Sequence, residues 1–247
     1  MSREHAVLGV DIGGSSIKCC IMNVEGLVRH ATLQYTNGKH PDAVLKLVTE
    51  IIELWNHDGP IGIGFPGLVS ANHIVDAPNM DEGWEGYDFS KRLNQRIGAP
   101  VAIINDADAA ALAMAQETDS WETENILCLT LGTGIGSAWL NRGELEAGTE
   151  YGRMAHPRLG CSLEQWASVR TLNEETLSID EWAERLATIL EFLLEQFNPD
   201  RFVLSGGITT NSEEWIDIVQ QRMSIPVEIS KYGDLTGAVG AAKLHSV

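Results

Sequence analysis

The chain has 247 residues, of which 44% are hydrophobic and 21% are charged. This ordinary globular balance excludes wholesale disorder, and the length allows one large domain or two small lobes. The 17 Lys and Arg residues are outnumbered by 35 Asp and Glu residues, which gives a formal net charge of −18. Because nucleic acids and anionic membranes attract basic surfaces, this charge argues against both as partners and also disfavours long polyanions.

The cysteines and the N-terminus indicate the compartment. None of the four cysteines belongs to a Cys-x-x-Cys pair, and Cys19, Cys20 and Cys128 lie in apolar runs. We therefore expect buried free thiols, a reducing compartment, and neither a disulfide framework nor a four-cysteine zinc site. The chain begins without a signal-peptide pattern and contains no uncharged apolar stretch of about 18 residues. The sequence predicts a cytoplasmic protein.

The first half of the chain combines a strand meander with alternating helices and strands. Apolar runs at residues 6–10, 17–22 and 27–35 predict strands, of which the first two are joined by a glycine-rich turn. Pro41 and apolar residues at helical spacing predict a helix over 41–55, which the turn at residues 58–60 ends. Buried strands are expected at 61–64 and 101–104, and an alanine-rich helix is expected at 107–116.

The same order starts again at residue 126. A strand at 126–131, a glycine turn at 132–136 and a returning strand at 137–140 repeat the pattern of residues 7–27, which indicates a duplicated architecture. A Ser178–Glu181 capping box begins a long helix that ends at Asn198. A strand at 201–204, an acidic helix near 212, a strand at 226–229 and a closing helix at 236–245 complete the chain.

These elements predict two α/β lobes that meet at a cleft. We expect a small N-terminal lobe of residues 1–106, closed by the C-terminal helix at 236–247. We expect the remaining residues 107–235 to form a larger lobe.

Three glycine-rich turns follow predicted strands, at residues 13–14, 132–136 and 206–207. Glycine lets a backbone turn tightly and bring N–H groups close to a phosphate, and Lys18 adds a positive charge beside the first turn. Asp11 could hold a magnesium ion through water. Each turn alone could be an ordinary hairpin, and none matches a Walker loop or a convincing dinucleotide fingerprint.

Asn105 and Asp106 follow the buried strand at 101–104, the position where ligands of α/β folds collect. Asp106 could accept a proton from an attacking hydroxyl group, as a general base does in phosphoryl transfer. Alternatively, Asp106 or Asp108 caps the helix that follows, and spacing alone favours the cap.

Five ordered motifs resemble those of ROK-type sugar kinases, which belong to the class with the actin and hexokinase fold. The motifs lie at residues 11–18, 64–67, 105–110, 131–136 and 204–208, and the resemblance extends from about residue 7 to about 242. The short length and the segment after Ser168 are most similar to the polyphosphate glucokinase branch. The resemblance implies a duplicated ribonuclease-H-like α/β fold and a homodimer.

The resemblance also implies a role for each matching residue. Asp106 would deprotonate a hydroxyl group, the 6-OH, of a glucose-like hexose. The sugar would be bound by Asn79, Asn105, Asp106, Glu150 and Glu164. The donor, ATP or polyphosphate, and Mg²⁺ would be bound by the glycine turns and their neighbours. Those residues are Asp11, Gly13, Gly14, Ser15, Ser16, Lys18, Gly132, Thr133, Gly134, Gly206 and Gly207, with Asp11 as the magnesium residue.

Two positions depart from the family pattern. The family places a sugar-contacting histidine directly after the glycine that corresponds to Gly152, and this chain has Arg153 there. Of the family's three zinc cysteines only Cys161 remains, so we expect no structural zinc. Because a guanidinium only donates hydrogen bonds, Arg153 puts glucose as the substrate in doubt and leaves an acidic or amino sugar open.

Two other classes of function are compatible with the resemblance. A sugar-sensing repressor would need a helix-turn-helix ahead of Asp11, and only ten residues precede it here. A degenerate protein that binds sugar without phosphorylating it is favoured by Arg153 alone, whereas Asp106 and the glycine turns argue against it.

Overall fold

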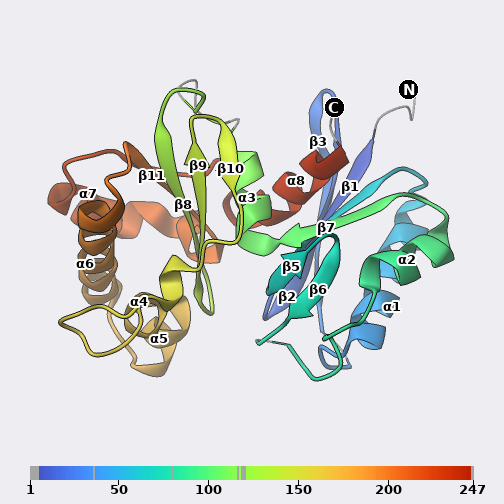
Figure 1. Ribbon diagram of the computed structural model, residues 1–247, viewed down its shortest axis with the longest axis horizontal. Helices are drawn as coiled ribbons and strands as arrows, with labels where there is room; N and C mark the ends of the chain where they lie inside the picture. Colours follow the sequence, from blue (N-terminus) through green and yellow to red (C-terminus); the bar gives the residue numbers. More distant parts are fainter. Residues whose placement is uncertain (1–5, 36, 79, 116, 118–120, 246–247) are drawn as a thin grey trace. The chain divides into compact units, whose positions relative to one another are not determined.

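Figure 1 shows the computed structural model, which describes the chain apart from residues 1–5, 36, 79, 116, 118–120 and 246–247. The chain folds into two compact α/β units, Met1–Ala113 with Gly237–Val247, and Met114–Thr236. The predicted division lies at residue 106, whereas most of helix α3 (Asp106–Met114) packs with the first unit. Among the described residues no helix is long and apolar enough to cross a membrane.

The first unit is built on a sheet with the strand order β3-β2-β1-β4-β7. Strands β1, β2 and β3 form the predicted antiparallel meander, whereas β1, β4 and β7 are parallel. The two inner parallel strands are almost wholly buried, as expected for strands covered on both faces. The strands are β1 (Val7–Ile12), β2 (Ser16–Asn23), β3 (Gly26–Gln34), β4 (Ile61–Phe65) and β7 (Val101–Asn105).

Helices α1 (Pro41–Trp55) and α2 (Phe89–Ile97) belong to the same unit. Helix α1 has the predicted bounds, with Pro41 in its first turn and the His40 side chain accepting a hydrogen bond from the backbone of Asp42. Helix α2 and the two-stranded sheet of β5 (Leu68–Ser70) and β6 (His73–Asp76) were not predicted. Their apolar periodicity extends over too few residues to be recognised.

The C-terminal helix α8 (Thr236–Ala242) lies directly on the backbone of two strands of the first sheet, as its red ribbon beside β1 shows in Figure 1. Gly9 in β1 and Gly62 in β4 are register partners. A Cβ atom on Gly9 would lie 1.9 Å from the carbonyl oxygen of Ala238, and one on Gly62 would lie 1.7 Å from that of Ala241. Only glycine fits at either position.

Helix α8 also packs closely on helix α3. A Cβ atom on Gly240 would lie 1.6 Å from the carbonyl oxygen of Ala109. Small residues thus fix α8 against both the sheet and α3. Because α3 begins at Asp106, the same packing holds the helix that carries this residue.

The second unit repeats the first sheet. Its strand order is β10-β9-β8-β11-β12, again with two antiparallel pairs followed by two parallel pairs. This match confirms the duplicated α/β fold that the sequence predicts. The strands are β8 (Asn125–Leu131), β9 (Ile135–Asn141), β10 (Glu144–Glu146), β11 (Arg201–Ser205) and β12 (Val227–Ile229).

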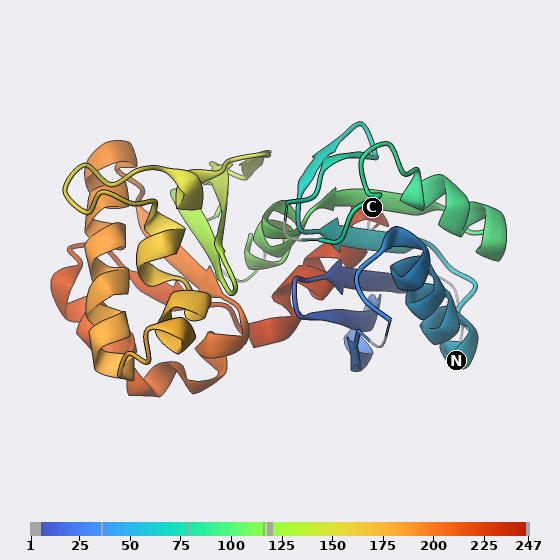
Figure 2. The same ribbon diagram turned by 90° about the horizontal axis from the view of Figure 1, so that it is seen from below.

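The long helix α6 (Ile179–Phe197) lies beside this sheet, as Figure 2 shows in orange. It begins with the predicted capping box of Ser178 and Glu181. The acidic helix expected near residue 212 starts as the 3-10 helix η2 (Gly207–Glu214) and becomes α-helical in α7 (Ile216–Arg222). The remaining helices are η1 (Tyr151–Arg153), α4 (Leu163–Ala167), α5 (Val169–Glu174), η3 (Gly233–Leu235) and, in the first unit, η4 (Lys243–His245).

We predict that Gly62→Ala lowers the free energy of unfolding by about 2 kcal/mol or more, because the added methyl group forces α8 off β4. Urea unfolding followed by far-UV circular dichroism measures this. Ser70→Thr also adds a methyl group, at an exposed position of β5, and should change stability by less than about 0.5 kcal/mol. Equal stabilities of Gly62→Ala and the wild type would contradict the packing of α8 described above.

Candidate active site

Two carboxylates lie at the same end of the first sheet. Asp11 in β1 is the register partner of Gly64 in β4, and Phe65 in β4 is the partner of Asn105, which Asp106 follows. A Cβ atom on Gly64 would lie 3.4 Å from the Cα of Asp106 and 3.6 Å from Oδ1 of Asp11. The parallel strands therefore bring Asp11 and Asp106 together around a glycine, at the carboxyl ends where ligands of α/β sheets bind.

Helix α8 limits the position of the Asp11 side chain. A Cβ atom on Gly237, in the first turn of α8, would lie 2.7 Å from Oδ2 of Asp11. Lys18 is the register partner of Asp11 on the other side, so their side chains leave the same face of the sheet. Gly237 was missed in the sequence, because nothing in its local pattern relates it to a residue near the other end of the chain.

Asn105 provides the N-cap of helix α3. Its Oδ1 accepts hydrogen bonds from the backbone N–H groups of Ala107 at 2.8 Å and Asp108 at 3.1 Å, and its Nδ2 donates to the carbonyl oxygen of Gly67 at 3.0 Å. The sequence-based assignment of the cap to Asp106 or Asp108 was therefore wrong. Asp106 lies in the first turn, where its Oδ1 accepts from the N–H of Ala107 at 2.9 Å.

The first glycine turn is held by Tyr35, the residue that directly follows β3. The backbone N–H of Gly13 donates to the carbonyl oxygen of Ser16 at 3.0 Å. The Tyr35 hydroxyl donates to the carbonyl oxygen of Gly13 at 2.6 Å. Burial, and then the nearby Asp11 carboxylate, raise the pKa of Tyr35, so its hydroxyl remains a protonated donor. Tyr35 was missed because its contact depends on the pairing of β3.

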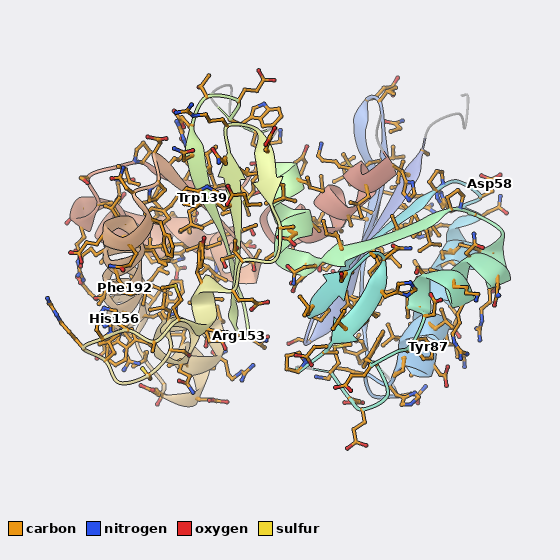
Figure 3. All side chains as sticks on the ribbon, viewed as in Figure 1. Asp58, Tyr87, Trp139, Arg153, His156 and Phe192 are labelled. Atoms are coloured by element: carbon orange, nitrogen blue, oxygen red, sulfur yellow. The ribbon has the colours of Figure 1, made fainter. Side chains whose placement is uncertain are left out.

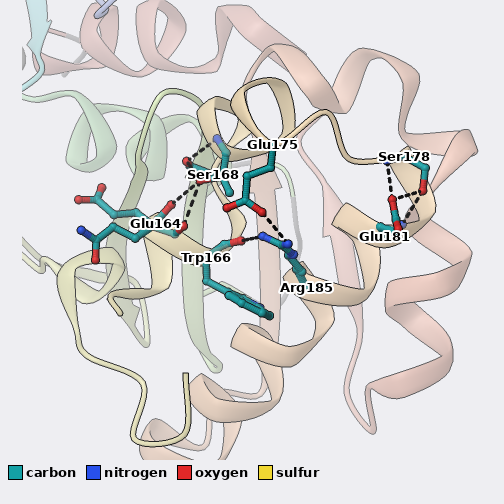
Figure 4. A network of polar contacts seen from close by, with 9 residues as sticks. Glu164, Trp166, Ser168, Glu175, Ser178, Glu181 and Arg185 are labelled. Atoms are coloured by element: carbon teal, nitrogen blue, oxygen red, sulfur yellow. Dashed lines mark hydrogen bonds and ion pairs between the residues drawn. The ribbon is translucent and has the colours of Figure 1, made fainter. Parts of the chain in front are cut away.

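The second glycine turn carries a carboxylate. Oε2 of Glu164 accepts from the backbone N–H of Ile135 at 3.4 Å. A Cβ atom on Gly134 would lie 2.6 Å from the same Oε2 atom. The N–H of Val169, the first residue of α5, donates to the carbonyl oxygen of Gly132 at 2.9 Å. Figure 4 shows Glu164 and the α5 cap Ser168 in one polar network. Glu164, a predicted sugar ligand, thus lies against a predicted phosphate turn.

The third turn also requires glycine. Gly206 has a φ of +111°, and a Cβ atom there would lie 2.2 Å from the carbonyl oxygen of Leu131, the residue before the second turn. This close approach brings the ends of β11 and β8 together. Gly207 has open space around its Cα instead.

Glu150 forms an ion pair with Arg153. Nε of Arg153 lies 3.2 Å from Oε2 of Glu150, across the single turn of η1, and the two side chains are 49% and 47% exposed. The buried Ser137 fixes this segment, because its Oγ accepts from the N–H of Tyr151 at 2.9 Å and donates to the carbonyl oxygen of Thr149 at 3.1 Å. Ser137 was also missed, since its sequence position in β9 indicates only a strand.

His156 does not replace the missing histidine. It packs on Phe192 with the ring centroids 4.8 Å apart, and its Nδ1 accepts from the backbone N–H of Arg158 at 3.2 Å. Figure 3 shows His156 beside Phe192, apart from Arg153. The predicted sugar ligand Asn79 lies outside the described residues. Within the described part of the chain, no group of three or more His, Cys, Asp or Glu side chains could hold a metal ion.

Comparisons with known proteins give a consistent result. The sequence model of the ROK family matches residues 7–165. The polyphosphate glucokinase of Mycobacterium leprae (strain TN) is 31% identical over 98% of this chain and 75% of its own length. That of Mycobacterium tuberculosis (strain CDC 1551 / Oshkosh) is 31% identical over 98% of this chain and 91% of its own length. The inorganic polyphosphate/ATP-glucomannokinase of Arthrobacter sp. strain KM has a similar structure, with a TM-score of 0.88, 30% identity and 97% of each chain covered.

We predict that Asn105→Ala lowers the free energy of unfolding by about 1–2 kcal/mol, because α3 loses its cap. Asn105→Asp keeps the accepting oxygen but loses the N–H group that donates to Gly67, so it should recover only part of that loss. Urea unfolding of both variants and of Asp106→Ala measures the contributions. If Asp106→Ala lowers the free energy of unfolding more than Asn105→Ala does, Asp106 rather than Asn105 caps α3.

Proposed function

Because the chain belongs to the ROK family, we propose that this phosphotransferase transfers a phosphoryl group from ATP or polyphosphate to a hydroxyl group of a hexose, in the manner of a glucokinase. The observation that carries the proposal is the pair of Asp11 and Asp106 at the carboxyl ends of β1 and β7. The relatives named polyphosphate glucokinase and glucomannokinase support sugar kinase activity, and the hexose, its 6-OH and the residue roles below are the proposal.

Asp106 is the proposed general base. Asn105 caps α3, so the helix does not depend on the Asp106 carboxylate for its cap. A carboxylate within hydrogen-bond reach of the acceptor hydroxyl takes its proton as the bond to phosphorus forms. Asn105 still holds the geometry, because its bonds to Gly67 and α3 tie the end of β4 to the residue after Asp106.

Glu150 and Glu164 are the proposed carboxylates for the other sugar hydroxyls. Both residues belong to segments that contact Ile135. Glu164 accepts a hydrogen bond from the N–H of Ile135. Gly152, two residues after Glu150, packs so closely that a Cβ atom on it would lie 2.0 Å from the carbonyl oxygen of Ile135. Carboxylates accept hydrogen bonds from hydroxyl groups, and two of them fixed to one backbone segment can select a hydroxyl configuration. Asn79 and Asn105 complete the proposed set.

The glycine turns and Lys18 are the proposed donor site. Backbone N–H groups and one ammonium group can bind phosphate oxygens in a chain whose net charge is −18, because distant charges are screened over about 10 Å. Mg²⁺ fits here, since it binds through one or two carboxylates, water and phosphate oxygens, and Asp11 supplies carboxylate oxygens beside Gly64 and Gly237 at the end of β1. When bound, the ion would neutralise charge on the transferred phosphoryl group.

Two observations point to different phosphoryl donors, one to ATP and the other to polyphosphate. Net charge disfavours a long polyanion, which would extend over acidic surface beyond the turns. The relatives named polyphosphate glucokinases favour it. An assay that offers the two donors separately decides between them.

We predict that Asp106→Asn lowers kcat by about 10²–10⁴-fold with either donor, because the amide cannot take the hydroxyl proton. Sugar affinity, measured by calorimetry without donor, should change less than about threefold, since the amide retains a hydrogen-bonding oxygen. A coupled assay over a panel of hexoses measures turnover.

Asp58→Asn is the matched control, because Asp58 is an exposed carboxylate that precedes β4, at the opposite end of that strand from Gly64 and Asp106. It should retain wild-type turnover. Near-normal turnover of Asp106→Asn would remove Asp106 from the role of base.

The Glu150–Arg153 pair favours one second candidate, a chain that binds sugar without phosphorylating it, because the ion pair occupies one oxygen of a proposed sugar ligand. The same panel tests it: sugar binding without turnover for every hexose and either donor would support the binding protein over the kinase.

A further inference from the structure

We propose that Arg153 sets the charge selectivity of the sugar site, so that the site accepts neutral hexoses and excludes hexoses that carry an ammonium group near Glu150. This inference rests on the proposed function, in which Glu150 binds hydroxyl groups of the acceptor.

The ion pair leaves hydrogen-bonding capacity on both of its members. It uses Nε of Arg153 and Oε2 of Glu150, and about half of each side chain is exposed. Among the described residues, neither the Nη groups of Arg153 nor Oε1 of Glu150 has a further partner. A sugar can therefore donate a hydroxyl to Oε1 while an adjacent sugar oxygen accepts from an Nη group.

The backbone keeps Arg153 near Glu150. Exposed ion pairs contribute little by themselves, but η1 places these two residues on one turn. A Cβ atom on Gly152 would lie 2.0 Å from the carbonyl oxygen of Ile135, and the N–H of Tyr151 donates to Ser137 at 2.9 Å. The turn between the two charged residues is thus fixed to the start of β9.

Arg153 reverses the preference of the site for the charge of the sugar. The Glu164 carboxylate accepts from the N–H of Ile135, and Glu150 lies two residues before Gly152, whose backbone packs on the carbonyl oxygen of Ile135. With a net charge of −18 and these two carboxylates, a site without Arg153 would favour a cationic sugar. A guanidinium stays charged at every physiological pH and offers only donors. It therefore binds sugar oxygens and repels an ammonium group. His156 cannot take this role, because it packs on Phe192.

The test compares aminodeoxy hexoses with the matching deoxy hexoses, with the substitution at ring positions 2, 3 and 4. This comparison separates the added charge from the lost oxygen. The measured quantity is kcat/KM of the wild type, Arg153→Met and Arg158→Met, at a pH where the amines are protonated. Arg158→Met is the matched control, because Arg158 is an exposed arginine of the same segment without a side-chain partner among the described residues.

For the wild type, we expect the amino sugar to be used about tenfold less well than its deoxy counterpart at one ring position, a size set by repulsion between close, partly solvated charges. That gap should close in Arg153→Met and persist in Arg158→Met. The ring position at which it closes identifies the carbon beside Arg153. Dissociation constants measured from tryptophan fluorescence should show the same pattern without turnover.

Two results would overturn the inference, and they differ from failure of the proposed function. An equal gap in the wild type and Arg153→Met, or no gap at any position, would overturn the role of Arg153 while leaving the kinase intact. A wild type that phosphorylates no sugar with either donor would overturn the proposed function, and the role of Arg153 with it.

Discussion

The first unit depends on the direct backbone contact between helix α8 and the elements beneath it. Gly9 and Gly62 admit the helix onto β1 and β4, and Gly240 admits it onto α3. Because none of these contacts leaves space for a methyl group, the packing holds α8 directly on the backbone of both strands and of α3. Gly237 then lies against the Asp11 carboxylate. Helix α8, near the C-terminus, therefore limits where Asp11 in the first strand can place its charge.

Duplication supplies two versions of one sheet, and each carries different chemistry. The first places Asp11 and Asp106 at the carboxyl ends of parallel strands. The second places Glu164 against its glycine turn and the Glu150–Arg153 pair beside the start of β9. The strand order is the same in both, so the difference lies in the residues that follow the strands. Function in such a fold is determined by these residues rather than by the architecture.

The sequence predicts those parts of the structure whose signal is local and long. Helices α1 and α6 and most strands follow from apolar spacing, and the repeated glycine turns reveal the duplication. Short elements such as β5, β6 and α2 extend over too few residues to show a period. The cap of α3 was misassigned, because Asn105, Asp106 and Asp108 are all good capping residues and only the backbone geometry selects Asn105. Contacts such as Tyr35 to Gly13 or Gly237 to Asp11 depend on tertiary packing, which no local pattern encodes.

The claim that α8 positions the Asp11 carboxylate for phosphoryl transfer is tested most directly by the magnesium dependence of Gly237→Ala. The added Cβ atom would lie 2.7 Å from Oδ2 of Asp11, so the carboxylate must move. We predict that the half-saturating Mg²⁺ concentration of the kinase reaction rises about tenfold, a loss of about 1.4 kcal/mol, while the sugar KM stays near the wild-type value. A wild-type magnesium dependence in a folded Gly237→Ala variant would contradict the account.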